Sequence, residues 1–62
     1  MKAKELKEKT TDELVALEAE LRDDLFRLRM RHYSGQLQKV SDMRTKRRDI
    51  ARVQTILNQR EG

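Results

Sequence analysis

The sequence of 62 residues contains no cysteine and a single histidine, His32, so two common ways of stabilising a very small domain are excluded. Without cysteine there can be no disulfide, and one histidine with no other ligand near it in the sequence is a poor basis for a zinc site. A chain below about 70–80 residues rarely stabilises itself through one hydrophobic core alone. We therefore expect association with another molecule to supply part of its stability.

Proline is also absent, glycine occurs twice, and the longest apolar run covers only residues 14–17. Such a run is too short for the apolar part of an export signal or for a membrane-spanning helix, so we expect a cytoplasmic protein with no membrane contact. The contents of 3% aromatic and 42% charged residues approach those of disordered chains. Most residues, however, are strong helix formers. An all-α protein is therefore expected.

Residues 11–33 have the pattern of a long amphipathic helix. Thr10 and Glu13 form the motif of a capping box, in which each side chain accepts a hydrogen bond from the backbone N–H of the other residue. Leucines at intervals of three and four residues share one face of this helix: Leu14, Leu17, Leu21, Leu25 and Leu28. Gly35 predicts its end, because glycine readily adopts the left-handed conformation that often follows a helix.

A second apolar stripe follows this glycine. It contains Val40, Met43, Ile50, Val53 and Leu57, with Ile56 beside it. The stripe predicts a helix over about residues 39–60, and the short link at about 34–38 favours antiparallel packing of the two helices. A short helical turn at about residues 2–8 precedes them. The expected fold is a long antiparallel two-helix hairpin with a short N-terminal helical turn, in one domain over residues 1–62.

The net charge of +4 is unevenly distributed along the chain. Acidic residues dominate between Thr10 and Asp24, and basic residues dominate afterwards. Arg44, Arg48 and Arg52 share the face of the second helix opposite its apolar stripe, with Arg47 on the flank. Like charges at this spacing destabilise an isolated helix, whereas a polyanion along the face would attract them and release counterions. The face is therefore a candidate nucleic-acid or phosphate contact, and the alternative is a solvated basic surface.

Phe26, Met30 and Tyr33 lie on one side of the first helix, away from the leucine stripe. They could pack against the turn of the same chain, against a protein neighbour, or against unpaired bases, which would stack on Tyr33. No serine–histidine–acid set or glycine-rich phosphate loop is present, and a two-helix hairpin has no cleft that excludes water. We therefore expect no enzymatic activity, no cofactor, no metal and no small-molecule substrate.

Several segments, taken in order, match one family. They are residues 1–6, 11–14, 26–30, 34–37, 47–53 and 55–57. With these segments the chain resembles bacterial large-subunit ribosomal protein number twenty-nine over essentially its whole length. It departs from the family at Arg31, His32 and Tyr33, where glutamine followed by small residues is more usual. The resemblance implies the hairpin fold and a place in the large ribosomal subunit.

The resemblance further implies that the protein is a structural constituent that binds ribosomal RNA near the polypeptide exit tunnel, through a basic helix face and the turn between the helices. The implied partners are this RNA, the neighbouring ribosomal protein number twenty-three and nascent-chain factors. The candidate RNA contacts are Lys2, Lys4, Arg29, Ser34, Gly35, Gln36, Arg44, Arg47, Arg48 and Arg52, and the candidate protein contacts are Phe26, Met30 and Tyr33. Two alternatives stay open: a helical adaptor for protein partners, and a general nucleic-acid-binding protein.

Overall fold

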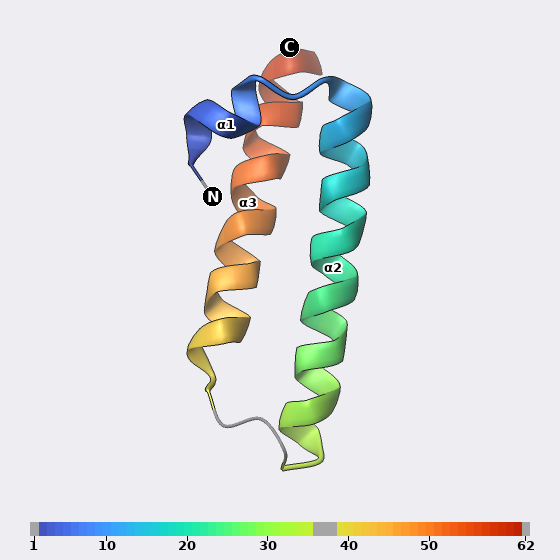
Figure 1. Cartoon of the computed structure of the whole chain (residues 1–62), viewed down its shortest axis with the longest axis vertical. Coiled ribbons are helices and arrows are strands. Elements are labelled where there is room, and N and C mark those ends of the chain that lie inside the picture. Colours follow the sequence, from blue (N-terminus) through green and yellow to red (C-terminus); the bar gives the residue numbers. More distant parts are fainter. Residues whose placement is uncertain (1, 36–38, 62) are drawn as a thin grey trace.

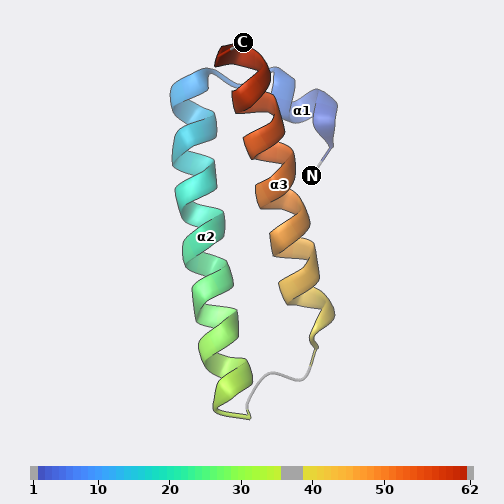
Figure 2. The same ribbon diagram turned by 180° about the vertical axis from the view of Figure 1, so that it is seen from behind.

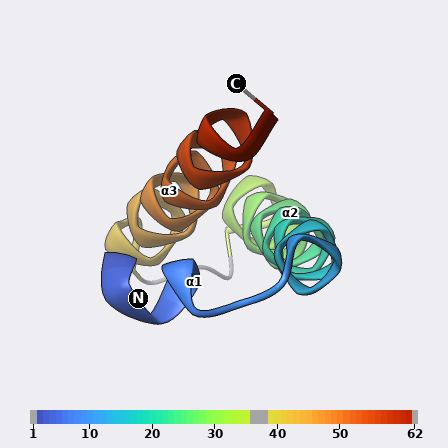
Figure 3. The same cartoon turned by 90° about the horizontal axis from the view of Figure 1, so that it is seen from above.

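The computed structural model describes residues 2–35 and 39–61, which form three α-helices: α1 (Ala3–Lys7), α2 (Thr11–Tyr33) and α3 (Ser41–Glu61). Helices α2 and α3 run antiparallel side by side, and α1 packs on α3 near its C-terminal end (Figures 1 and 2). Seen from above, the three helices occupy the corners of a triangle (Figure 3). The molecule measures 41 × 17 × 16 Å. The predicted all-α hairpin with a short N-terminal helix is confirmed.

Both ends of α2 form as the sequence predicts. At its start, the Thr10 hydroxyl accepts a hydrogen bond from the Glu13 backbone N–H (3.1 Å), and the Glu13 carboxylate accepts one from the Thr10 N–H (3.2 Å). At its end, Gly35 has a φ of 78°, in the left-handed region. The capping box satisfies two N–H groups that would otherwise have no partner, and it thereby fixes where the helix begins.

The core is an apolar seam along the facing sides of α2 and α3. Its buried members are Leu6, Leu14, Leu21, Leu25, Met43, Ile50, Val53 and Ile56, and Leu17, Leu28 and Leu57 pack against them partly buried. The leucine stripe of α2 is therefore confirmed. Along α3 two details differ from the expectation: Val40 is 48% exposed, and Ile56 is more deeply buried than Leu57. Val40 lies outside the seam because it precedes the start of α3 at Ser41.

Helix α1 extends this seam, a role that the sequence pattern did not reveal. Leu6 is 1% exposed, and α1 covers the flank of α3 on which Ile56 lies. Arg60 ties the same end together, because its guanidinium donates to the Lys7 carbonyl oxygen (3.1 Å) and to the Thr11 hydroxyl (3.3 Å). One side chain thus links the end of α3 to the end of α1 and the start of α2.

Two charged residues beside the apolar seam and one within it are accommodated in the hairpin. Asp24 of α2 and Lys46 of α3 form an ion pair of 3.5 Å between the helices, with both side chains about one third exposed. Asp49 is the one buried charged residue among residues 2–35 and 39–61, at 7% exposure. No helix in this part of the chain is long and apolar enough to span a membrane.

We predict that Leu6→Ala destabilises the fold, because it removes a fully buried side chain that holds α1 to the seam. Large-to-small substitutions of buried leucine typically cost about 2–5 kcal/mol. Thermal unfolding followed by circular dichroism measures the effect. Val15→Ala is the matched control, since Val15 is 55% exposed and its loss should have little effect. Equal unfolding temperatures for the two variants would show that α1 is not part of the core.

We also predict a pH dependence at the capping box. The pKa of Glu13 is lowered from its ordinary value of 4.5, chiefly because the Thr10 backbone N–H donates to the carboxylate. A lowered folded-state pKa means that the stabilisation is complete above 4.5 and disappears as the pH falls through the lowered value.

The measurement compares the free energy of unfolding of the unaltered chain with that of Glu13→Gln, whose amide does not titrate. The difference should be constant above the ordinary pKa of glutamate and should shrink below it. A Glu20→Gln variant serves as the exposed control, because Glu20 makes no ion pair among the described residues. A pH-independent difference for Glu13→Gln would contradict the assigned role of the capping box.

Candidate nucleic-acid interface

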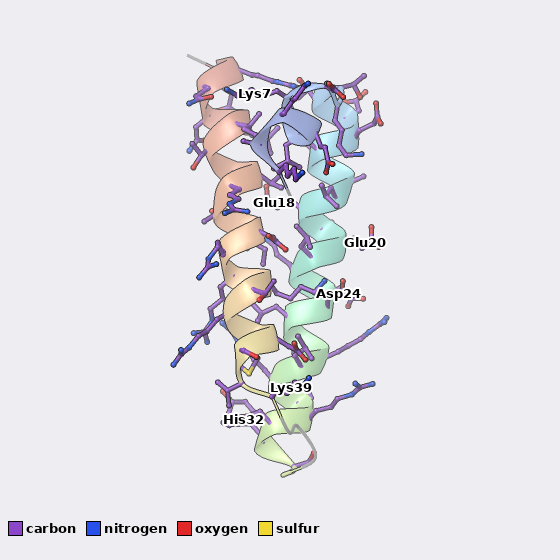
Figure 4. All side chains as sticks on the ribbon, turned by 60° about the vertical axis from the view of Figure 1, so that its left-hand side comes forward. Lys7, Glu18, Glu20, Asp24, His32 and Lys39 are labelled. Atoms are coloured by element: carbon purple, nitrogen blue, oxygen red, sulfur yellow. The ribbon has the colours of Figure 1, made fainter. Side chains whose placement is uncertain are left out.

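The hairpin is electrically asymmetric along its long axis. The half that ends in the turn carries an excess of bases: Arg27, Arg29, Arg31, Lys39, Arg44, Lys46, Arg47 and Arg48, against Asp23, Asp24, Asp42 and Asp49. In Figure 4, Glu18 and Glu20 lie in the opposite half, and His32 and Lys39 lie beside the turn. We call this basic half of the molecule the turn half. A concentration of one charge sign raises the local potential and attracts counter-ions of the opposite sign.

Little of this positive charge is offset within the hairpin. Asp23 pairs with Arg27 at 2.9 Å, and Asp24 pairs with Lys46. Asp49 is on the buried side of α3, where it forms no ion pair with another described residue. Within residues 2–35 and 39–61, the following arginines lack a carboxylate within 4.0 Å: Arg29, Arg31, Arg44, Arg47 and Arg48. Each of these is exposed and able to receive an anionic partner.

One surface groove lies between α2 and α3 on one side of the hairpin. Its lining consists of Arg22, Leu25, Phe26, Arg29, Arg47 and Ile50, around a volume of about 320 Å³. Of its four residues from α2, the spacing of Arg22, Phe26 and Arg29 places these three on one flank of that helix. Arg29 and Arg47 therefore come to one groove from opposite helices. We call it the Phe26 groove.

A second groove lies between α1 and the outer side of α3. It is lined by Ala3, Lys7, Arg48, Ala51, Arg52, Thr55, Ile56 and Gln59 and has a volume of about 360 Å³. Its small side chains leave room between the two helices, and cations from both helices line it. A third groove of about 270 Å³ lies on the opposite side of the α2–α3 seam from the Phe26 groove, and is lined by Asp24, Arg27, Leu28, Arg31 and Lys46.

The candidate RNA-contact arginines of α3 therefore do not lie along one continuous face of the hairpin. Arg47 belongs to the Phe26 groove with Arg29, whereas Arg48 and Arg52 line the groove beside α1. Arg44 is exposed on the outer side of α3. Periodicity within α3 could not show this division, because it depends on where α1 and α2 pack around that helix.

The remaining candidate RNA contacts lie at the two ends of the molecule. Ser34 caps α2 and donates its hydroxyl to the Arg31 carbonyl oxygen (3.0 Å), and Gly35 supplies the left-handed turn. Gln36 falls outside the described residues. Lys2 and Lys4 are exposed at the start of α1 and within it. The structure thus does not gather the candidates into a single site.

The three candidate protein contacts are all open to solvent in the hairpin. Phe26 is 59%, Met30 48% and Tyr33 75% exposed, so the described part of the chain does not cover them. Phe26 lines its groove between arginines, whereas Met30 and Tyr33 lie outside the three grooves. The rings of Tyr33 and His32 are 6.0 Å apart and inclined by 53°. Phe26 and the other two residues therefore face different surroundings.

Two cations, one in the Phe26 groove and one in the groove beside α1, were not among the candidates from the sequence. Arg22 was counted with the acidic stretch around it, although its spacing from Phe26 and Arg29 already places the three on one flank of α2. Lys7 enters the second groove only because Leu6 holds α1 against α3. Helical spacing in the sequence could have identified Arg22, whereas Lys7 could be identified only from the packing of α1 against α3.

Together, the seam and these exposed cations define a class: a small helical hairpin with basic surface grooves. A family model described as "Ribosomal L29 protein" matches residues 4–60. The chain belongs to this family, whose members are structural and non-enzymatic. The resemblance noted from the sequence is thereby confirmed.

Three relatives show how far the similarity extends, each described as large ribosomal subunit protein uL29. The chain is 56% identical to the protein of Carboxydothermus hydrogenoformans over 61 residues, covering 98% of this chain and 88% of that protein. It is 44% identical to the protein of Geobacter sulfurreducens, with complete coverage of both. The protein of Syntrophobacter fumaroxidans is 44% identical over 98% of this chain and 92% of its own length.

The turn provides a test of local geometry. A Cβ added to Gly35 would meet no atom within 4 Å, so the cost of Gly35→Ala should come only from the left-handed backbone, at about 1–2 kcal/mol. Gly35→Asn should cost less, because asparagine adopts this conformation more readily. Denaturant unfolding measures both. Equal stability of the alanine variant and the unaltered chain would contradict the left-handed turn.

Proposed function

We propose that this chain, as a structural constituent of the large ribosomal subunit, binds ribosomal RNA through the turn half of its hairpin. Its family supports the first part of this statement, and the cytoplasmic ribosome is then its place of action. The second part rests on the arginines that lack carboxylate partners within the described chain, above all Arg29, Arg47 and Arg48. They would form the contacts to phosphate.

The chemistry of these side chains suits RNA. Arginine presents a planar array of donors that can bind two phosphate oxygens at once, and it keeps its charge at all physiological pH values. RNA phosphates come in closely spaced series, so binding releases counterions and reduces the repulsion between neighbouring arginines. Among the described residues, no carboxylate lies within 4.0 Å of Arg29, Arg47 or Arg48 to neutralise them.

The position near the polypeptide exit tunnel, the neighbouring ribosomal protein number twenty-three and contact with nascent-chain factors are also part of this proposal. The exposed side chains of Met30 and Tyr33 support a protein contact, because neither lines a basic groove and both leave apolar surface in water. In such a contact, these residues would cover the end of α2, while the arginines of α3 bind RNA.

The test is to titrate the purified chain with protein-free large-subunit ribosomal RNA, transfer RNA and duplex DNA over a series of salt concentrations. We expect tight binding to the ribosomal RNA, with an affinity that falls steeply with salt. Arg48→Gln should weaken binding and lower the slope of log affinity against log salt by about 1, since it removes one phosphate contact. Circular dichroism should show unchanged helicity, because Arg48 is exposed.

Lys9→Gln is the matched control, because it lowers the net charge equally but lies at the end of the molecule remote from the turn half. Its salt slope should stay close to that of the unaltered chain. Equal affinity for the three nucleic acids would instead indicate a general nucleic-acid-binding protein. Absence of RNA binding would indicate an adaptor between proteins.

A further inference from the structure

We propose that the Phe26 groove is a binding site for one unpaired RNA nucleotide, whose base stacks on Phe26 and whose phosphates are bound by Arg29 and Arg47. This inference rests on the proposed RNA-binding function and assigns a distinct task to one of its surfaces. It also changes the role of Phe26, for which the sequence suggested a contact with protein.

The lining of the groove has the composition of a nucleotide site. Leu25 and Ile50 are buried members of the seam and form an apolar floor. Phe26 stands beside them with 59% of its surface exposed, so much of the ring is available to a ligand. The volume of about 320 Å³ lies at the lower end of the roughly 300–1,000 Å³ typical of ligand pockets. One flat, partly apolar group therefore fits its size and chemistry.

The charges around the ring indicate what kind of group this is. Arg29 and Arg47 reach the groove from opposite helices, and neither has a carboxylate within 4.0 Å among the described residues. Arg22, on the same flank of α2 as Phe26, donates through Nε to Glu18 at 2.9 Å, which holds its guanidinium in place. An apolar peptide would leave two arginines without counter-charge, whereas a nucleotide supplies both a ring and phosphates.

The nucleotide must be unpaired. In an A-form duplex the base faces are stacked on one another and are not accessible to a side chain, so aromatic residues bind bases in loops, bulges and ends. Phenylalanine has no hydrogen-bonding group, and stacking tolerates any base. We therefore expect the site to select an everted nucleotide by shape and charge and not by base identity.

The experiment uses the full chain bound to protein-free large-subunit ribosomal RNA. Ultraviolet irradiation crosslinks aromatic side chains to stacked bases, and trypsin then releases residues 23–27, which contain the single phenylalanine of the chain. We expect mass spectrometry to find a nucleotide adduct on this peptide. Phe26→Leu should abolish the adduct and lower the affinity about tenfold, as the loss of one stacked base implies.

The salt dependence of the RNA affinity separates the contribution of base stacking from that of phosphate contacts. Phe26→Leu should leave the slope of log affinity against log salt unchanged, because no phosphate contact is lost, and Phe26→Tyr should restore the affinity. Arg47→Gln should lower the slope by about 1. Val15→Ala is the control, since Val15 is similarly exposed at 55% but lies in the acidic half of α2. It should bind like the unaltered chain.

The possible failures are distinguishable. If the unaltered chain binds the RNA and Phe26→Leu binds equally tightly, the nucleotide site is wrong while the proposed function stands. If Phe26→Leu leaves RNA binding intact but weakens binding to a neighbouring ribosomal protein, Phe26 is a protein contact and the inference is also wrong. If the unaltered chain fails to bind this RNA, the proposed function fails first. Circular dichroism verifies that each variant is folded.

Discussion

The apolar seam between α2 and α3 is the constraint on which the rest of this structure depends. With no cysteine, two helices and a short third one must hold together through leucine, isoleucine, valine and methionine side chains along a molecule only 16–17 Å thick. Such a shape has one buried layer, and Asp49 is the one charged residue buried in it among the described residues. Leu6 and Arg60 close the seam at one end, so helix α1, the end of α3 and the start of α2 form one packed cap.

The seam determines where the charges lie. Apart from Asp49, every described residue outside it is exposed or half-exposed, and among the charged residues of the turn half arginine and lysine outnumber aspartate. The ion pair between Asp24 and Lys46 joins the two helices, but it offsets only one cation. Mutual repulsion among the remaining arginines lowers the stability of the free hairpin. Binding to a polyanion would remove this repulsion, so the features that weaken the isolated chain also favour its assembly with RNA.

The sequence predicts the individual helices well, because capping, periodicity and glycine conformation are local. Thr10 and Glu13 form the expected capping box, Gly35 adopts the left-handed conformation, and the leucines of α2 face the seam. It does not predict how the helices are placed around one another. Leu6 stands alone in a polar segment without periodicity, and α1 shifts the buried side of α3 toward Ile56. For the same reason, helical spacing within α3 grouped Arg47 with Arg48, whereas the packing places Arg47 in a groove with Arg29. Membership of the family came from matching motifs and not from charge.

The central claim, that the turn half faces RNA in the assembled subunit, is tested most directly by arginine-specific chemical modification read out by mass spectrometry. The rate at each arginine is compared between the free chain and the chain in large subunits washed with high salt. We predict strong protection of Arg29, Arg47 and Arg48 in the subunit. Arg60, whose guanidinium is already hydrogen-bonded within the hairpin, should change least. Equal modification of the turn-half arginines in both states, with protection confined to the opposite end, would contradict the account.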